Sequence, residues 1–155
     1  MKKRLIFLLP VFLVILTAQA QTSDQALTHN RSFTGATAGK KEYKAIYQLD
    51  SNDPKIITKA IRNINNALND PRIAGKLHVE LIAFSGGTEA MLKDSKYGDD
   101  LKALVQKGVI VAQCNNSLHE RNLTRDQLYD FIAVVPSGNG ELIIREAEGW
   151  TIIKP

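Results

Sequence analysis

Short apolar runs alternate along this chain with stretches in which apolar residues recur every three or four positions. The runs have the length and bounding turn residues of buried strands, which predicts strands at residues 43–49, 77–84, 109–113, 131–135 and 150–154. The helical spacing and the capping residues at segment starts predict helices at residues 54–69, 88–92, 99–107, 123–128 and 137–148. Strand and helix therefore alternate through most of the chain, with no internal repeat.

This alternation predicts an α/β domain with a mostly parallel five-stranded sheet over residues 43–155. Parallel strands need crossover connections, and the crossover helices cover both faces of the sheet. The first long helix is marked by Asp53 as a capping residue and by Pro54 in the first turn. Ligands of such sheets bind outside the carboxyl ends of the strands, so the loops that follow the strands are the first place to look for a site.

The first 20 residues have the pattern of a secretory signal peptide. A basic start, Met1 to Arg4, precedes an apolar run from Leu5 to Ala18 and the small residues of Ala18-Gln19-Ala20. The apolar run is shorter than the roughly 20 residues of a membrane-spanning helix. We therefore expect cleavage after Ala20 and a periplasmic or secreted protein with no membrane segment after cleavage. Residues 21–42 are polar with little periodicity, which predicts a lead-in to the domain.

Composition changes this picture little, but charge removes one class of partner. The chain has 155 residues, of which 44% are hydrophobic and 23% charged, and this is ordinary for one globular domain. Its formal charge of +4 includes Lys2, Lys3 and Arg4 of the expected signal peptide. Without these, 17 of the 20 Lys and Arg residues remain against 16 Asp and Glu. A nearly neutral domain has no surplus of cations for a run of phosphates, so we expect no nucleic-acid partner.

Cys114 is the chain's only cysteine, and it follows the third predicted strand where a helical turn begins. A helix start with cationic neighbours favours a thiolate, so His119 and Arg121 are candidates for stabilising one. The alternative is a small apolar side chain that fills space at the strand end. A lone cysteine rules out a Cys-x-x-Cys redox pair and an intramolecular disulfide. His78 and Glu80 alternate with apolar residues of the second strand, which predicts a partly solvated face. With three scattered histidines, we expect neither a metal site within one chain nor a cofactor.

The carboxyl ends of the predicted strands collect glycines and small polar residues. Beside Cys114, they are Asn52, Ser85, Gly86, Gly87, Asn115, Asn116, Ser137 and Gly138. Parallel strands end at the same edge of a sheet, so we expect these four loops to lie together. Ser85-Gly86-Gly87 lacks the Gly-Lys-Ser/Thr ending of a phosphate-binding P-loop, and no Gly-x-Gly-x-x-Gly follows the first strand. The arrangement suits the binding and activation of a small group at the cysteine.

Five segments form a set that is specific enough to compare with known families. They are Ser85-Gly86-Gly87, Gly108-Val109, Cys114-Asn115-Asn116-Ser117-Leu118, Val135-Pro136-Ser137-Gly138 and Glu148-Gly149-Trp150-Thr151-Ile152-Ile153-Lys154-Pro155. As a set they resemble the DsrE/DsrF-like family of sulfur-relay proteins, and in particular its branch with signal peptides. The resemblance implies a three-layer α/β/α domain that assembles into homotrimers or homohexamers. It also implies that Cys114 accepts and passes on sulfur as a persulfide.

Two departures bear on how a thiolate would be held. Ser117 stands where the family pattern leads us to expect threonine. Asn115 and Asn116 are neutral, so stabilisation of a thiolate would fall to backbone amides, His119 and Arg121.

Three functions follow as hypotheses. The first is a persulfide carrier or sulfur-binding protein, with at most a transferase-like activity, that works with a sulfur donor or acceptor protein. The second is a non-enzymatic homo-oligomer that binds a small ligand or a metal at subunit junctions, with Cys114 in a structural role. The third is a redox protein in which Cys114 forms mixed or intersubunit disulfides in an oxidising compartment.

Overall fold

The computed structural model describes residues 23–155, and the chain divides into two units, Met1–Thr37 and Ala38–Pro155. The predicted signal peptide and its cleavage site lie outside the described residues. In the first unit, residues 23–32 form a helix whose side chains are all exposed. The sequence predicted only a polar lead-in here, because a helix without a buried stripe has no apolar periodicity. Within residues 23–155, no helix is long and apolar enough to cross a bilayer.

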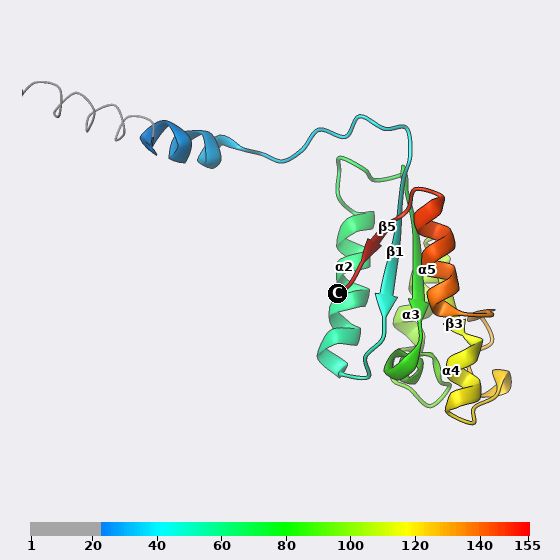
Figure 1. The fold of residues 1–155 in the computed structure, drawn as a ribbon. Coiled ribbons are helices and arrows are strands. Elements are labelled where there is room, and N and C mark those ends of the chain that lie inside the picture. Colours follow the sequence, from blue (N-terminus) through cyan, green and yellow to red (C-terminus); the bar gives the residue numbers. More distant parts are fainter. Residues whose placement is uncertain (1–22) are drawn as a thin grey trace, which may run out of the picture. The chain divides into compact units, whose positions relative to one another are not determined.

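Five parallel strands form the sheet of the second unit (Figure 1). They are β1 Tyr43–Leu49, β2 Leu77–Ala83, β3 Ile110–Cys114, β4 Ala133–Val135 and β5 Thr151–Ile153. Their spatial order is β4-β3-β2-β1-β5, and each neighbouring pair is parallel. The predicted α/β fold with a five-stranded parallel sheet is therefore confirmed.

β4 is shorter than the predicted strand because an arginine side chain forms hydrogen bonds with the backbone carbonyl groups that precede β4. The guanidinium of Arg125 donates to the carbonyl oxygens of Tyr129, Asp130 and Ile132 over 3.2, 3.1 and 2.6 Å. The N–H of Ile132 also donates to the carbonyl of Tyr129. Backbone groups bonded in this way are not available for a strand ladder. Pairing with β3 therefore begins only at Ala133.

Helices fill the connections between the strands, as predicted. They are α2 Pro54–Leu68, the 3₁₀ helix η1 Ser85–Met91, α3 Gly98–Gln106, α4 Asn115–Glu120, the 3₁₀ helix η2 Arg125–Gln127 and α5 Gly138–Ala147. α2 begins with Asp53 accepting a hydrogen bond from the N–H of Lys55. α5 begins with Ser137 Oγ accepting from the N–H of Gly140. Both starts are the capping residues that the sequence predicted.

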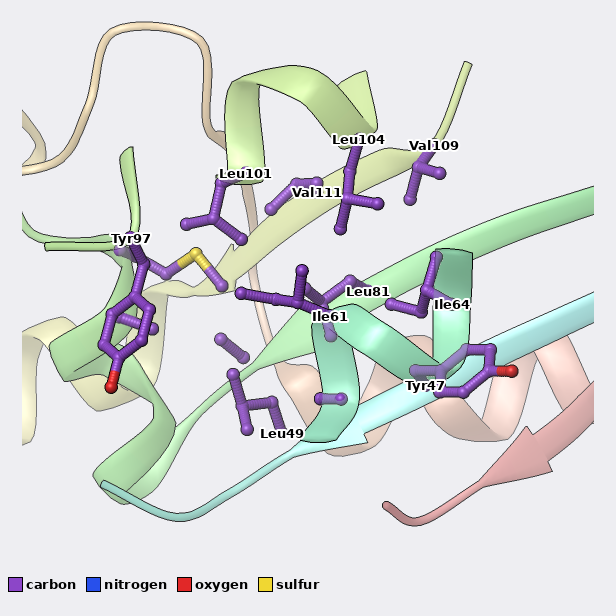
Figure 2. Packing of buried hydrophobic residues seen from close by; sticks show 14 of the residues in the cluster. Tyr47, Leu49, Ile61, Ile64, Leu81, Tyr97, Leu101, Leu104, Val109 and Val111 are labelled. Atoms are coloured by element: carbon purple, nitrogen blue, oxygen red, sulfur yellow. The ribbon is translucent and has the colours of Figure 1, made fainter. Parts of the chain in front are cut away.

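The two faces of the sheet are covered unequally, with α2 and α5 on opposite sides (Figure 1). On the first face lies the larger buried cluster, which includes Tyr47, Leu49, Ile61, Ile64, Leu81, Leu101, Leu104, Val109 and Val111 (Figure 2). The smaller cluster on the α5 face consists of Ile46, Ile82, Ala112, Leu142 and Trp150. Side chains alternate between faces along a strand. Cys114 therefore shares the α5 face with Ala112, whereas Gln113 shares the first face with Val111.

Candidate functional site

Cys114 lies where the sequence placed it, as the last residue of β3 and the residue that precedes α4. Its φ of −70° and ψ of 121° are ordinary extended values, so the chain turns from strand to helix without backbone strain. The residue is only 5% exposed. A Cβ added to Gly138 would lie 3.3 Å from the Cys114 Cβ and 2.8 Å from Cδ1 of Phe84. Any side chain at position 138 would therefore press on the cysteine.

Contacts between loops bring the carboxyl ends of β1, β2, β3 and β4 together. The N–H of Ser85 donates to Ser117 Oγ over 2.9 Å, which joins the end of β2 to α4. A Cβ added to Gly86 would lie 2.9 Å from the backbone nitrogen of Asn52, so the loops after β1 and β2 are also in contact. Gly138 brings the loop after β4 to Cys114. The structure thus brings together the four loops that the sequence grouped at one edge.

The candidate residues in these loops differ in how open they are. Asn52, Ser85 and Asn116 are exposed. Gly86, Asn115 and Ser137 are half-buried. Gly87 and Gly138 are buried, and both lie against neighbouring atoms closely enough that a Cβ would collide. The two buried glycines are therefore explained by packing alone, without any contact to a ligand.

The two candidates for thiolate stabilisation have partners of their own. His119 is exposed, and its Nε2 lies 3.2 Å from Nδ2 of Asn115. Arg121 forms an ion pair with Glu89, and its Nη1 donates to the carbonyl of Ser85 over 3.5 Å. None of the hydrogen bonds of His119 or Arg121 in the described part of the chain reaches Cys114. Arg121 therefore fastens α4 to η1, and Glu89 offsets its charge.

The sequence of this domain identifies the family to which the chain belongs. Residues 44–155 match the model of the DsrE/DsrF-like family. The chain belongs to the DsrE/DsrF-like family. In agreement, the structure of a protein of unknown function from Methanobacterium thermoautotrophicum, MTH1491, is similar at 30% sequence identity and a TM-score of 0.70, over 74% of this chain and 100% of that chain.

Two more distant structures share the fold of this DsrE/DsrF-like domain. A conserved protein of unknown function from Bacteroides thetaiotaomicron, BT1422, has 13% identity and a TM-score of 0.59, over 78% of this chain and 100% of its own. The ychN protein from E. coli has 14% identity and a TM-score of 0.60, over 75% of this chain and 100% of its own. No match to the chain is found among the curated proteins.

Gln113 contacts the candidate site of this DsrE/DsrF-like domain and was not among the residues predicted from the sequence. Its side chain is fully buried on the first face of the sheet, opposite to Cys114. Its Nε2 donates to the carbonyl of Cys114 over 2.9 Å and to Oγ1 of Thr88 over 3.0 Å. A signal was present, since an amide at the end of the apolar run Val109 to Ala112 marks a polar group that needs buried partners.

Glu80 was predicted to lie on a partly solvated face, and that prediction is wrong. Its side chain is 1% exposed and accepts a hydrogen bond from Nε of Arg145 over 2.8 Å. Arg145 also pairs with Glu141 and Glu148 of the α5 region and lies 4.4 Å from the Trp150 ring centroid. Burial raises the pKa of the Glu80 carboxyl, and the charge of Arg145 opposes that rise. α5 covers this position, which the strand's own alternation did not reveal.

A cavity of about 520 Å³ lies away from the cysteine, near the amino ends of β1, β2 and β5. Its lining includes Tyr43, Lys44, Tyr47, Leu77 and Thr151.

Across residues 23–155, no group of three or more His, Cys, Asp or Glu side chains is placed to hold a metal ion. Among the described residues, Gln113 is the one whose side chain forms a hydrogen bond with Cys114, through the carbonyl of that residue.

Proposed function

We propose that this protein is exported and carries sulfur as a persulfide on Cys114. The observation that supports this most directly is the position of the only cysteine, at the carboxyl end of an interior parallel strand and against Gly138 of the loop after β4. It is the position that matches the persulfide cysteine of the DsrE/DsrF-like family. The signal-peptide pattern of residues 1–20 supports export.

The proposed step is a transfer of neutral sulfur without net oxidation. The thiolate of Cys114 attacks the outer sulfur of a donor persulfide or polysulfide. A new S–S bond forms at Sγ, the donor's S–S bond breaks, and the electron pair leaves with the donor as a thiolate or a shortened polysulfide. Delivery is the same exchange in reverse, with an acceptor thiolate attacking the outer sulfur on Cys114.

Intact mass of the purified mature protein tests this proposal. After incubation with inorganic tetrasulfide, we expect the wild type to gain one or more sulfur atoms and to lose them again on treatment with a thiol reductant. The Cys114→Ser variant should gain none, because it lacks the attacking thiolate. The same spectrum reports export, since a chain cleaved after Ala20 begins at Gln21. Wild-type protein that takes up no sulfur would contradict the proposal.

A second candidate function has one observation in its favour. Cys114 is only 5% exposed, as expected of a structural cysteine in a protein that binds a small ligand or metal elsewhere. This candidate predicts that the thiol resists iodoacetamide until the protein is unfolded. The persulfide proposal predicts alkylation in the folded state, so one reagent separates the two.

We further propose that the domain forms a homo-oligomer through an exposed apolar patch on its α5 side. The patch consists of Ile110, Ile143, Ile144 and Ile152. Each of these isoleucines is at least 42% exposed. By strand register, Ile110 and Ile152 lie on the side of the sheet that α5 covers. Single exposed apolar residues are normal, but several on one face are typical of an interface. A trimer or hexamer is the size that the family resemblance implies.

Replacing Ile143 and Ile144 together with lysine should weaken this assembly. Burying two charges in an apolar interface is unfavourable, so we expect the dissociation constant to rise at least about tenfold. Light scattering after size-exclusion chromatography measures the change. Leu27→Lys is the matched control, because Leu27 is 68% exposed but belongs to the first unit. A wild type that is monomeric, or an oligomer unaffected by the double substitution, would contradict this proposal.

A further inference from the structure

Gln113 is a fully buried amide whose contacts meet the backbone of the cysteine itself. One Nε2 group donates both to the carbonyl of Cys114 and to the hydroxyl of Thr88, which is also fully buried. The orientation of the amide is fixed by chemistry, because a carbonyl oxygen accepts and never donates. Turning the amide over would set Oε1 against the Cys114 carbonyl. Gln113 therefore joins η1, through Thr88, to the peptide that follows Cys114.

Gln113 Oε1 is buried and has no hydrogen-bond partner in the described part of the chain. A buried acceptor without a donor is unfavourable, whereas an apolar side chain of similar shape has no such cost. The contribution of Gln113 is therefore to be sought in what it holds in place, and what it holds is Cys114.

Two more polar contacts fasten the segment after Cys114 to the same 3₁₀ helix. Ser117 Oγ accepts the N–H of Ser85, and Arg121 pairs with Glu89. The three residues follow at intervals of four, and each binds within η1 Ser85–Met91. Gln113 lies on the strand side of the cysteine, while Ser117 lies in α4 and Arg121 directly follows it. Cys114 is thus fixed from both sides against one element.

We propose that Gln113, together with Thr88, is a positioning residue for Cys114, an inference that rests on the persulfide function proposed above. A peptide unit is planar, so a bond to the Cys114 carbonyl fixes the plane that it shares with Asn115. That plane limits the directions in which the Cys114 side chain leaves the backbone. Attack on an S–S bond requires alignment of three sulfur atoms, and a misplacement of about 1 Å costs on the order of 100-fold in rate.

Gln113→Met and the pair Thr88→Val and Thr88→Ser test this role in the full mature chain. Methionine keeps the shape but removes both donated bonds, valine removes only the hydroxyl, and serine retains it. We expect Gln113→Met and Thr88→Val to slow sulfur uptake from inorganic tetrasulfide about tenfold or more, and Thr88→Ser to restore a rate near that of wild type. Circular dichroism and urea unfolding confirm that each variant is folded under the assay conditions.

A second readout separates this inference from the function on which it rests. The rate at which iodoacetamide alkylates Cys114 is measured against pH in each folded variant, and Gln113→Met and Thr88→Val should alter the plateau rate or its midpoint. If the wild type accepts sulfur and these two variants match it in uptake and pH profile, the positioning role is overturned while the carrier function stands. If the wild type accepts no sulfur, the carrier function fails, and the alkylation profiles still decide whether Gln113 positions the thiol. Should Gln113→Met not fold, the valine and serine pair carries the comparison.

Discussion

The Gly87→Ala variant is expected to lose at least about 3 kcal/mol of unfolding free energy, at the upper end of the cost of overpacking. A Cβ at position 87 would lie 2.7 Å from the carbonyl carbon of Leu49 and closer still to its oxygen. That oxygen already accepts the N–H of Phe84 over 3.1 Å, so it cannot retreat without opening the junction of β1 and β2. Urea unfolding of the purified variant measures the loss.

Gly39→Ala is the matched control, because a Cβ at position 39 meets nothing within 4 Å. We expect its unfolding free energy to stay within about 0.5 kcal/mol of wild type, as for most surface substitutions. Equal urea midpoints for the two variants would contradict the packing argument. The loop after β2 would then be free to move, and the sequence-based assignment of Gly87 to a ligand site would regain support.

The framework of the fold could be predicted because its signals are local. Ile57, Ala60, Ile61 and Ile64 recur at helical spacing, and all four are buried under the sheet. Asp53 and Ser137 cap the helices that they were predicted to cap. The meeting of the loops also follows, because parallel strands with helical crossovers place their carboxyl ends at one edge. Cys114 was located at the end of β3 by the same reasoning.

The polar contacts around the site could not be predicted, because their partners lie far apart in the sequence. Arg121 was expected near a thiolate, but its partner Glu89 is 32 residues away. Glu80 and Arg145 are separated by 65 residues, and nothing within β2 indicates that α5 covers Glu80. Whether a polar side chain is buried, and what it pairs with, depends on which element packs on it, and that is a tertiary property. Distance along the chain to Cys114 was therefore a poor guide to which residues support it.

Replacing Arg145 with methionine is expected to destabilise the domain by about 3–5 kcal/mol, the usual cost of breaking a buried ion pair from one side. Glu80 is 1% exposed, and its Oε1 has no partner among the described residues, so Arg145 is the group that offsets its charge. Methionine keeps part of the contact with the Trp150 ring but no charge. Glu80→Gln should cost much less, because Arg145 retains Glu141 and Glu148 as partners. Urea unfolding of both single variants and the double variant measures the coupling.

The dependence on pH distinguishes an unpaired charge from a loss of packing. In the folded protein, burial raises the pKa of the Glu80 carboxyl. The stability that comes from the protonated carboxyl is therefore fully present below the pKa of glutamate in the unfolded chain, about 4.3, and is lost as pH rises through the folded pKa. Without Arg145 that folded pKa is higher still, and the loss by about pH 8 is larger. We therefore expect the deficit of Arg145→Met relative to wild type to shrink from about pH 8 to about pH 5, since carboxylates that do not contact Arg145 contribute equally to both proteins and those of Glu141 and Glu148 change the deficit in the same direction. In the Glu80→Gln background the same substitution should cost less and depend less on pH, because it removes only the contact with the Trp150 ring and the more exposed pairs with Glu141 and Glu148. A deficit that is independent of pH in both backgrounds would mean that Arg145 acts by packing on Trp150, and that the Glu80 carboxyl stays protonated in the folded protein.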